Sequence, residues 1–336
     1  MIPNQWYVIL ESREIKKNQL KGFTRFGEKI IAWRDNNGTL GVFRDRCPHR
    51  GIQLSKGKIK DNRLQCPFHG FEYDTSGQCT LIPANGKASQ PPAYIRANAY
   101  PVREAHGFVY VWYTPDPAAA KIPSNESLPE VPWFDDLDDS LVASSFTDLW
   151  KAHYSRAIEN QLDVVHVPFI HHTTIGRGIG PVVNGPYTKV SNNSISFWPL
   201  NEEDRGQKPL RPDQIEEAPK KSTYITFIFP NLWQNHIMDS MRIIVAFVPI
   251  DDNHTLFYLR TFQKMVKLPL LRDLYFLVTK LFNIIVLGQD RRVVETHQPQ
   301  ATSLKMDEHL IAGDHPIILY RKMRENLKDG KKMQDK

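Results

Sequence analysis

The sequence predicts an α+β protein with two domains: an N-terminal all-β domain and a C-terminal domain with a twisted antiparallel sheet and helices. Residues 1–115 contain short runs of β-branched and aromatic residues and show no helical periodicity. Residues 116–130 are rich in proline and polar residues, which is typical of a linker. In residues 131–323, strand-like segments alternate with two helical ones, and residues 324–336 form a charged tail.

Strands of the N-terminal domain are expected where apolar and aromatic residues run together between turn residues. Asn36-Asn37-Gly38 separates two such runs and predicts a β-hairpin, because Asn and Gly tolerate the backbone angles of a tight turn. The strand-like runs are Tyr7–Leu10, Lys29–Trp33, Leu40–Phe43 and Phe108–Trp112.

The C-terminal domain is expected to contain a helix over Ala152–Val165 and a longer one over Leu271–Gln298. From Arg324 onward the charged tail is expected to fray. Its strand-like runs are Leu141–Phe146, Ser194–Trp198, Tyr224–Phe229, Arg242–Val248 and Thr255–Thr261.

The most apolar stretch lies inside the longer helix, from Leu274 to Gly288, and is interrupted by Lys280. It is shorter than the about 20 apolar residues that a membrane-spanning helix needs, so no integral membrane segment is expected. A helix buried in the protein is the favoured interpretation, and a surface that touches a membrane is the alternative. The N-terminus lacks a charged region followed by an apolar run, so no signal peptide is expected.

The bulk composition is that of an ordinary soluble protein. Of the 336 residues, 41% are hydrophobic and 24% are charged, and the formal net charge is +6. Lysines and arginines are scattered among acidic residues, whereas a nucleic-acid-binding protein usually gathers them in a stripe with aromatic residues. The mild basic excess instead suits an acidic electron-carrier protein as a partner.

Two short motifs each supply one cysteine and one histidine: Cys47-Pro48-His49-Arg50-Gly51 and Cys66-Pro67-Phe68-His69-Gly70. Two thiolates and two imidazoles can hold a tetrahedral zinc, or a [2Fe-2S] cluster with the thiolates on one iron and the imidazoles on the other. Zinc sites usually pair like residues at short spacing, whereas here each loop gives one of each kind, so the spacing favours the cluster. The prolines and glycines suit tight loops whose backbone amides approach the cluster sulfides.

The chain has three cysteines, and the two motifs use two of them. Cys79 is left without a partner and is expected to be an inert thiol. Because no disulfide framework is possible within the chain, a reducing compartment, the cytoplasm, is expected.

The two motifs resemble the cluster motif of the Rieske non-haem iron oxygenases. The resemblance implies that Cys47, Cys66, His49 and His69 hold a [2Fe-2S] cluster and that a catalytic domain follows. The respiratory-complex type of Rieske protein has a similar motif but adds a disulfide between its loops, and neither His49 nor His69 has a cysteine beside it.

A second set of polar residues occurs about a hundred residues downstream. Asn160, Asp163 and His166 are spaced by three, so they share a face of a continuous helix. His171 is five residues further, about 140° round the helix, and Pro168 is expected to turn the chain so that the imidazoles converge. Two histidines and a carboxylate from elsewhere would form the facial triad of a non-haem iron(II) oxygenase. Taken alone, this spacing is more typical of a buried polar cluster, and the upstream motifs favour iron.

This segment also resembles the iron-site motif of the same family. The resemblance implies that His166 and His171 bind a mononuclear Fe(II) and that Asn160 lies near it. It further implies a homotrimer, in which Asp163 links His166 to His69 of a neighbouring subunit and conducts electrons. Structural roles are expected for His153, His172 and His297, and Glu159 is expected to face solvent.

The third iron ligand is sought in the long helix, where Asp290 and Glu295 lie five positions apart and about 140° round the axis. The face of Asp290 is largely apolar and is expected to be buried, where a lone carboxylate is costly unless it meets a cation. Glu295 shares its face with Arg291 and Arg292, as in a solvated ion-pair surface. Asp290 is therefore the predicted ligand, and the family pattern agrees.

Together these features predict the oxygenase component of a Rieske non-haem iron system. Electrons from NAD(P)H would arrive through a separate ferredoxin or flavin reductase, since no dinucleotide fingerprint is present. Ile82-Pro83-Ala84-Asn85-Gly86 and the short chain resemble the monooxygenase and demethylase branch, and the oxygenases acting on tetrapyrroles, more than the dioxygenase branch. With O2, the protein would hydroxylate or demethylate an aromatic, heterocyclic or tetrapyrrole-like substrate. The alternative is a Rieske electron carrier without oxygenase chemistry.

Overall fold

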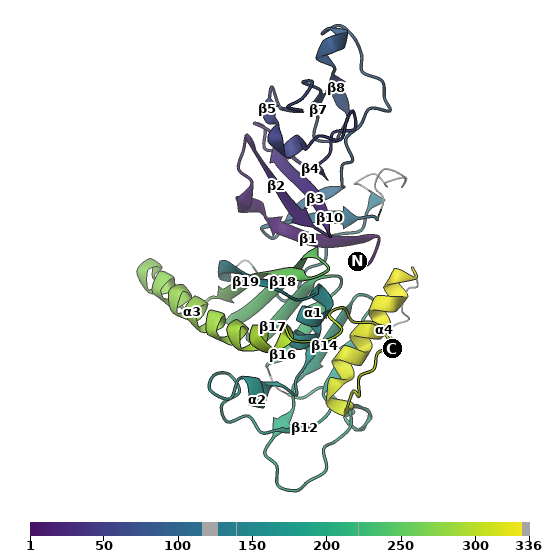
Figure 1. The fold of residues 1–336 in the computed structure, drawn as a ribbon. Coiled ribbons are helices and arrows are strands. Elements are labelled where there is room, and N and C mark those ends of the chain that lie inside the picture. The colour runs from purple at the N-terminus through teal and green to yellow at the C-terminus, as the bar shows by residue number, and fades with distance from the viewer. Residues whose placement is uncertain (116–126, 139, 221, 331–336) are drawn as a thin grey trace. The chain divides into compact units, whose positions relative to one another are not determined.

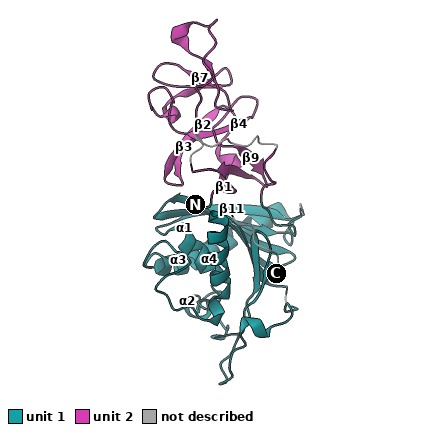
Figure 2. Ribbon diagram, turned by 90° about the vertical axis from the view of Figure 1, so that its right-hand side faces the viewer, with its two compact units in different colours: residues 1–2, 132–336 teal, residues 3–131 magenta. Residues whose placement is uncertain are grey.

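The computed structural model of the chain describes residues 1–115, 127–138, 140–220 and 222–330. The chain divides into two compact units, Pro3–Val131 and a larger one made of Met1–Ile2 with Pro132–Lys336 (Figure 2). Most of the expected linker, residues 116–126, and the end of the expected tail, residues 331–336, lie outside the described residues.

The smaller unit is built from three small antiparallel sheets and short 3-10 turns. Each predicted strand run falls within an observed strand, and the Asn36-Asn37-Gly38 hairpin joins β3 to β4 with Gly38 at a φ of 96°. The sheets are β1(Gln5–Glu11)–β10(Phe108–Tyr113)–β9(Val102–Ala105), β2(Gln19–Arg25)–β3(Glu28–Arg34)–β4(Leu40–Arg44), and β5(Lys58–Lys60)–β6(Arg63–Gln65)–β7(Glu72–Tyr73)–β8(Cys79–Leu81).

The larger unit is organised around a seven-stranded antiparallel sheet, with a small β12(Val182–Val183)–β15(Asn201–Glu202) pair beside it (Figure 1). Five of the seven strands were predicted from their runs of β-branched and aromatic residues, whereas the strands Tyr187–Val190 and Leu232–Met238 were missed. The sheet order is β11(Val142–Trp150), β19(His254–Gln263), β18(Met241–Asp251), β17(Leu232–Met238), β16(Tyr224–Ile228), β14(Ser194–Trp198) and β13(Tyr187–Val190).

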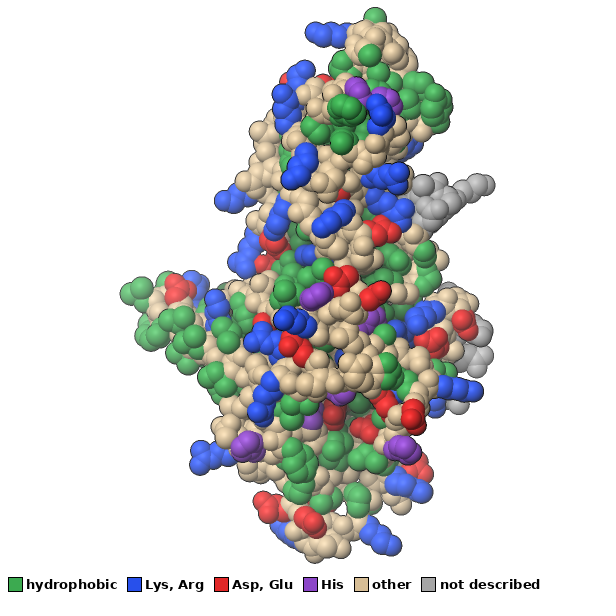
Figure 3. Space-filling view, in the orientation of Figure 1, with side chains coloured by type: hydrophobic (Ala, Val, Ile, Leu, Met, Phe, Trp, Pro, Cys, Tyr) green, Lys and Arg blue, Asp and Glu red, His purple; other side chains and the backbone are tan. Residues whose placement is uncertain are grey.

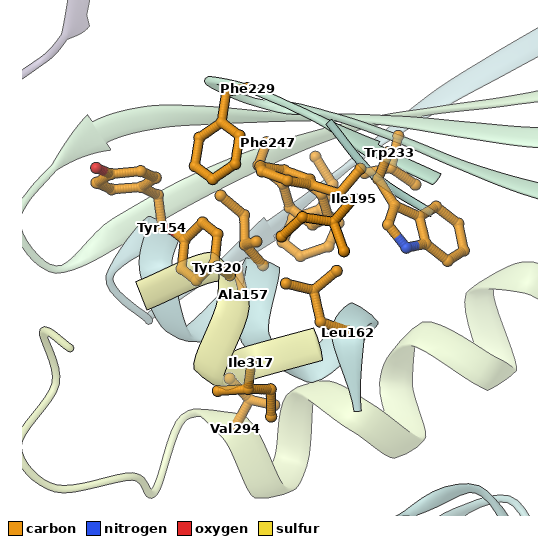
Figure 4. Close-up of a cluster of buried hydrophobic side chains, with 14 of the residues drawn as sticks. Tyr154, Ala157, Leu162, Ile195, Phe229, Trp233, Phe247, Val294, Ile317 and Tyr320 are labelled. Carbon is orange, nitrogen blue, oxygen red and sulfur yellow. The ribbon is translucent and has the colours of Figure 1, made fainter. Parts of the chain in front are cut away.

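The described residues of the larger unit form four helices: α1(Tyr154–Leu162), α2(Val167–Ile170), α3(Pro269–Val294) and α4(His315–Lys328). Phe247 of β18 and Phe229 of the turn after β16 point toward α1 and α4 and pack with Leu162 and Tyr320 (Figure 4). This core, with Val294 at the end of α3, holds α1 and α3 in fixed places on the sheet. Short 3-10 turns complete the two units at Ser12–Glu14, Leu54–Lys56, Pro83–Asn85, Pro212–Gln214 and Ala312–Asp314.

The C-terminal segment corrects the expectation of a frayed tail from Arg324. Helix α4 continues to Lys328, and Arg324 is only 5% exposed because it donates hydrogen bonds to the carbonyl and hydroxyl oxygens of Thr302. Arg321, one turn earlier, is buried against Glu159. Glu159 therefore does not face solvent, contrary to expectation, and is 4% exposed.

The apolar stretch Leu274–Gly288 is not a buried helix as expected. It lies within α3, which packs one side against the larger unit and leaves the other in solvent, so Leu274 is 56% exposed while Leu287 is buried. Among the described residues, no helix is long and apolar enough to cross a membrane.

Candidate metal centres

The two Cys/His loops of the smaller unit have the same backbone geometry. Cys47 N–H donates to the Ile52 carbonyl and Cys66 N–H to the Phe71 carbonyl, both at 2.8 Å. Gly51 and Gly70 donate back to the carbonyls of their cysteines and have φ angles of 74° and 72°. A residue with a Cβ is strained in this region, so each loop needs its glycine to close.

The loops present buried thiols and exposed imidazoles. Cys47 and Cys66 are both buried, whereas the rings of His49 and His69 lie on the surface with their centroids 4.7 Å apart. The His49 ring stacks on Phe71 at 4.6 Å, which fixes its direction. Burial raises the pKa of the Cys66 thiol, and the backbone N–H groups of Phe68 and His69 oppose that rise.

The four side chains form a ligand set that suits a [2Fe-2S] cluster. Each loop gives one thiolate and one imidazole, and the two imidazole rings lie with their centroids 4.7 Å apart. Two thiolates on one iron and two imidazoles on the other, with sulfides bridging the irons, are the ligands of such a cluster.

Two buried groups flank the Cys47 loop. The Tyr73 hydroxyl lies 3.2 Å from Cys47 Sγ, and Cys79 Sγ lies 3.6 Å from the Leu81 carbonyl oxygen. Cys79 is buried, which raises the pKa of its thiol and keeps it protonated. Its burial agrees with an inert thiol.

In the larger unit, α1 ends earlier than expected. It stops at Leu162, and Asp163 is extended, with φ −83° and ψ 126°. The Asp163 carboxylate accepts hydrogen bonds from the N–H groups of Val165 and His166, and this turn starts α2. Asp163 and His166 therefore do not share a face of α1, contrary to the expectation from their spacing. The chain turns at Asp163. Pro168 instead lies in the first turn of α2, where proline is tolerated.

The structure brings His166, His171 and Asp290 together. Asp290 Oδ1 lies 2.9 Å from His171 Nε2 and 3.5 Å from His166 Nε2. Asp290 is only 3% exposed, and among the described residues its Oδ1 accepts no hydrogen bond of good geometry. A buried carboxylate oxygen without a donor, facing two imidazole nitrogens, fits a bound divalent cation such as Fe(II).

Neighbouring residues orient these imidazoles. Gln289 Oε1 lies 2.8 Å from His171 Nδ1, so the Nδ1–H donates to it and Nε2 keeps its lone pair toward Asp290. Burial lowers the pKa of His171, but its contacts with Asp290 and Gln289 together more than offset this, so the pKa is raised. Asp163 Oδ2 lies 3.5 Å from His166 Nδ1. Gln289 was not predicted, because its role depends on a contact between α3 and the loop after α2.

The other candidate carboxylate lies elsewhere. Glu295 accepts a hydrogen bond from Lys151 N–H at 2.8 Å, and Arg291 pairs with Asp148 at 2.6 Å. The predicted ion pairs between Glu295 and the helix arginines are therefore wrong. The predicted apolar face of Asp290 is buried at Leu287 and Val294, but Val293 is exposed.

The remaining histidines have local hydrogen-bond partners. His153 caps the N-terminus of α1 through Ser155, and burial lowers its pKa to about 4. His172 and His297 are exposed, and each contacts a nearby carbonyl oxygen, of Phe169 and Val294 respectively.

The three converging residues line a cavity of about 850 Å³ within the larger unit. Most of its wall is apolar and comes from the sheet and α3; Trp233, Ile243, Leu259, Phe282 and Leu287 are examples. Asn160 and Asn235 also line it, and among the described residues Asn160 Nδ2 and Asn235 Oδ1 are buried without a hydrogen-bond partner.

Comparison with known proteins agrees with this organisation. Residues 5–101 match the Rieske [2Fe-2S] domain, and residues 150–330 match the vanillate O-demethylase oxygenase C-terminal domain. The chain is 29% identical over 214 residues to the putative toluene-4-sulfonate monooxygenase system iron-sulfur subunit TsaM2 of Comamonas testosteroni, over 60% of this chain and 57% of that protein. It is 30% identical over 175 residues to the chloroplastic protein TIC 55 of Arabidopsis thaliana, over 51% of this chain and 30% of that protein.

The matches thus span less than two thirds of these curated relatives. Among solved structures, NdmA of Pseudomonas putida CBB5 has a TM-score of 0.73 at 23% identity, covering 97% of this chain and 90% of that one. Dicamba monooxygenase has a TM-score of 0.68 at 16% identity, covering 98% of each chain. At this identity the likeness concerns the fold. With both of its halves matched, the chain belongs to the Rieske oxygenases that carry the vanillate O-demethylase type of C-terminal domain.

Proposed function

We propose that this protein is the oxygenase component of a Rieske non-haem iron system. The observation that carries the proposal is the convergence of His166, His171 and Asp290 on the wall of a large cavity, in a chain that also holds the Cys/His loops. When bound, the cluster would supply electrons one at a time and the iron would activate O2 beside the substrate. The cavity wall would hold an organic molecule against the triad and keep bulk water away.

The substrate we propose is an aromatic, heterocyclic or tetrapyrrole-like molecule that is hydroxylated or oxidatively demethylated. A largely apolar cavity of about 850 Å³ suits a molecule of that kind. The unpartnered amide groups of Asn160 and Asn235 would donate to and accept from polar atoms on its edge, and so set which carbon faces the triad.

We also propose a homotrimer in which Asp163 of one subunit meets His69 of the next. Support comes from two positions: the Asp163 carboxylate lies beside His166 with 26% of its side chain exposed, and the His69 ring is exposed on its loop. A carboxylate between two imidazoles would hydrogen-bond both and provide a short electron path.

The electron donor we propose is an acidic ferredoxin or flavin reductase, in a reducing compartment such as the cytoplasm. Exposed Arg46 and Arg50 lie on the Cys47 loop beside His49, and the chain carries a net charge of +6. Opposite charge would steer such a donor to the exposed imidazoles.

The alternative function is an electron carrier. Such a protein would not need the buried Asp290 carboxylate, whose Oδ1 lacks a hydrogen-bond donor among the described residues of the cavity wall. The two functions separate in an oxygen-uptake experiment with a reducing system and a panel of aromatic, heterocyclic and methoxylated compounds. We expect one class to stimulate uptake, and His166→Ala to abolish this while the cluster stays reducible. A reducible cluster with no stimulated uptake across the panel, or undiminished uptake in His166→Ala, would contradict the proposal.

A further inference from the structure

The first two thirds of α3 present an apolar face that no described part of the chain covers. Leu270 is 86% exposed and Leu274 is 56% exposed, and hydrophobic side chains gather on the part of α3 that extends away from the sheet (Figures 1 and 3). At 100° per residue this outer face spans an arc of about 140°. Its exposed members are Leu270, Leu271, Leu274, Leu277, Val278, Leu281, Ile284 and Ile285.

The opposite side of α3 belongs to the protein interior. Asn283 and Leu287 are buried and line the cavity with Thr279. Phe282 stands between the two sides, because it lines the cavity and is still 43% exposed. The outer face is therefore separated from the cavity by the thickness of one helix.

Three of the four charges along this segment are positive. Between Met265 and Gln289 the chain carries Lys267, Arg272 and Lys280 but a single acid, Asp273, which pairs with Arg272 at 3.3 Å. Lys267 and Lys280 are exposed, and within the described residues neither forms an ion pair. A bare apolar face with unpaired cations at its edge is complementary to an anionic lipid surface.

We infer that the outer face of α3 docks on an anionic membrane surface, with the helix lying in the plane of the lipid headgroups. The helix would not cross the bilayer, since no described helix is long and apolar enough to span a membrane. A second copy of this chain fits less well, because paired helices use a narrow seam bordered by charges of both signs. Docking would bring the cavity wall at Phe282 close to the acyl chains.

Flotation of the whole protein with vesicles tests this. One set of vesicles is made of phosphatidylcholine, and a second contains phosphatidylglycerol as well. We expect the protein to float with the anionic vesicles, and Leu274→Gln with Leu277→Gln to reduce the bound fraction about tenfold or more, because two half-exposed leucines lose their transfer to lipid. Lys267→Gln with Lys280→Gln should remove most of the preference for anionic vesicles.

The matched control is Leu304→Gln with Ile311→Gln, two exposed apolar residues outside α3, which should float like the parent protein. The inference would be overturned if the protein floated with neither kind of vesicle, or if the α3 variant and the control variant floated equally. So would a fall in oligomer size on light scattering in the Leu274→Gln, Leu277→Gln variant without a change in flotation, since that result assigns the face to a second copy. None of these outcomes depends on iron or oxygen uptake, so the proposed function stands or falls separately.

Discussion

Asp290 and Glu295 lie five positions apart near the end of α3, yet their surroundings differ. Asp290 faces two imidazoles from inside the protein, whereas Glu295 accepts a hydrogen bond from the backbone N–H of Lys151, between β11 and α1. We expect Asp290→Ala to lose about one iron per chain while keeping the cluster, because one of three ligands is gone. Glu295→Ala should retain that iron; loss in both variants, or only in Glu295→Ala, would refute the ligand assignment. Iron is counted by elemental analysis.

Gln289 is expected to act on iron through His171. Gln289→Leu removes the acceptor that orients the His171 ring, so affinity for the mononuclear iron should fall about 10- to 100-fold, measured by competition with a chelator. Thr173→Val removes only the hydrogen bond that Gln289 donates, at 3.1 Å, and serves as the control with near-parent affinity. Unchanged affinity in Gln289→Leu would show that the ring is held without this contact.

Sequence alone predicted the candidate metal ligands, and it missed the neighbouring residues that folding brings beside them. The Cys47 and Cys66 loops each place a thiol and an imidazole within three positions, so the sequence pattern by itself indicates a metal site. Gln289 and Asn235 acquire their places only when α3 and the sheet pack, and nothing in their local sequence indicates a site.

At the scale of elements, the same limit explains why α4 was missed. Its buried face includes Arg321 and Arg324, whose charges suggest a solvated segment until their partners are known. The end of α1 was misplaced for a related reason: Asp163 bonds the backbone ahead of it and stops the helix, which helical spacing by itself does not reveal. The strands were easier, since runs of β-branched and aromatic residues favour strands whatever they later pack against.

The ion pair between α1 and α4 yields a stability prediction. Glu159→Gln removes the buried carboxylate that accepts two hydrogen bonds from Arg321 and leaves the guanidinium only the partly exposed Glu308, so the free energy of unfolding should fall by about 1.5–3 kcal/mol in denaturant titration. Glu325→Gln, in a more exposed pair with Lys328, should change it by less than about 1 kcal/mol. The double variant Glu159→Gln, Arg321→Met should recover part of the loss, because the two charges that remain, Arg156 and Glu308, pair with each other at 2.8 Å. Equal losses of unfolding free energy in Glu159→Gln and Glu325→Gln would show that the buried pair contributes no more to stability than the exposed one.

At the scale of the whole molecule, the proposed trimer makes electron transfer an event between subunits. Asp163→Asn should keep both metal centres but slow electron transfer by about tenfold or more, because a charge-assisted hydrogen bond to the imidazole is weakened. The measurement is a single turnover by rapid mixing of the reduced protein with oxygen and substrate. Parent-like transfer in Asp163→Asn would remove the bridging role, and a monomer on light scattering would remove the trimer.

The central claim is that one chain holds two different iron centres. It is tested most directly by counting iron and acid-labile sulfide per chain in protein purified and reconstituted without oxygen. We expect three irons and two sulfides per chain. Two irons and both sulfides belong to a [2Fe-2S] cluster at Cys47, His49, Cys66 and His69, and the third iron is bound at His166, His171 and Asp290. Two irons with two sulfides would indicate an electron carrier without a catalytic iron. Zinc without sulfide would exclude both iron centres.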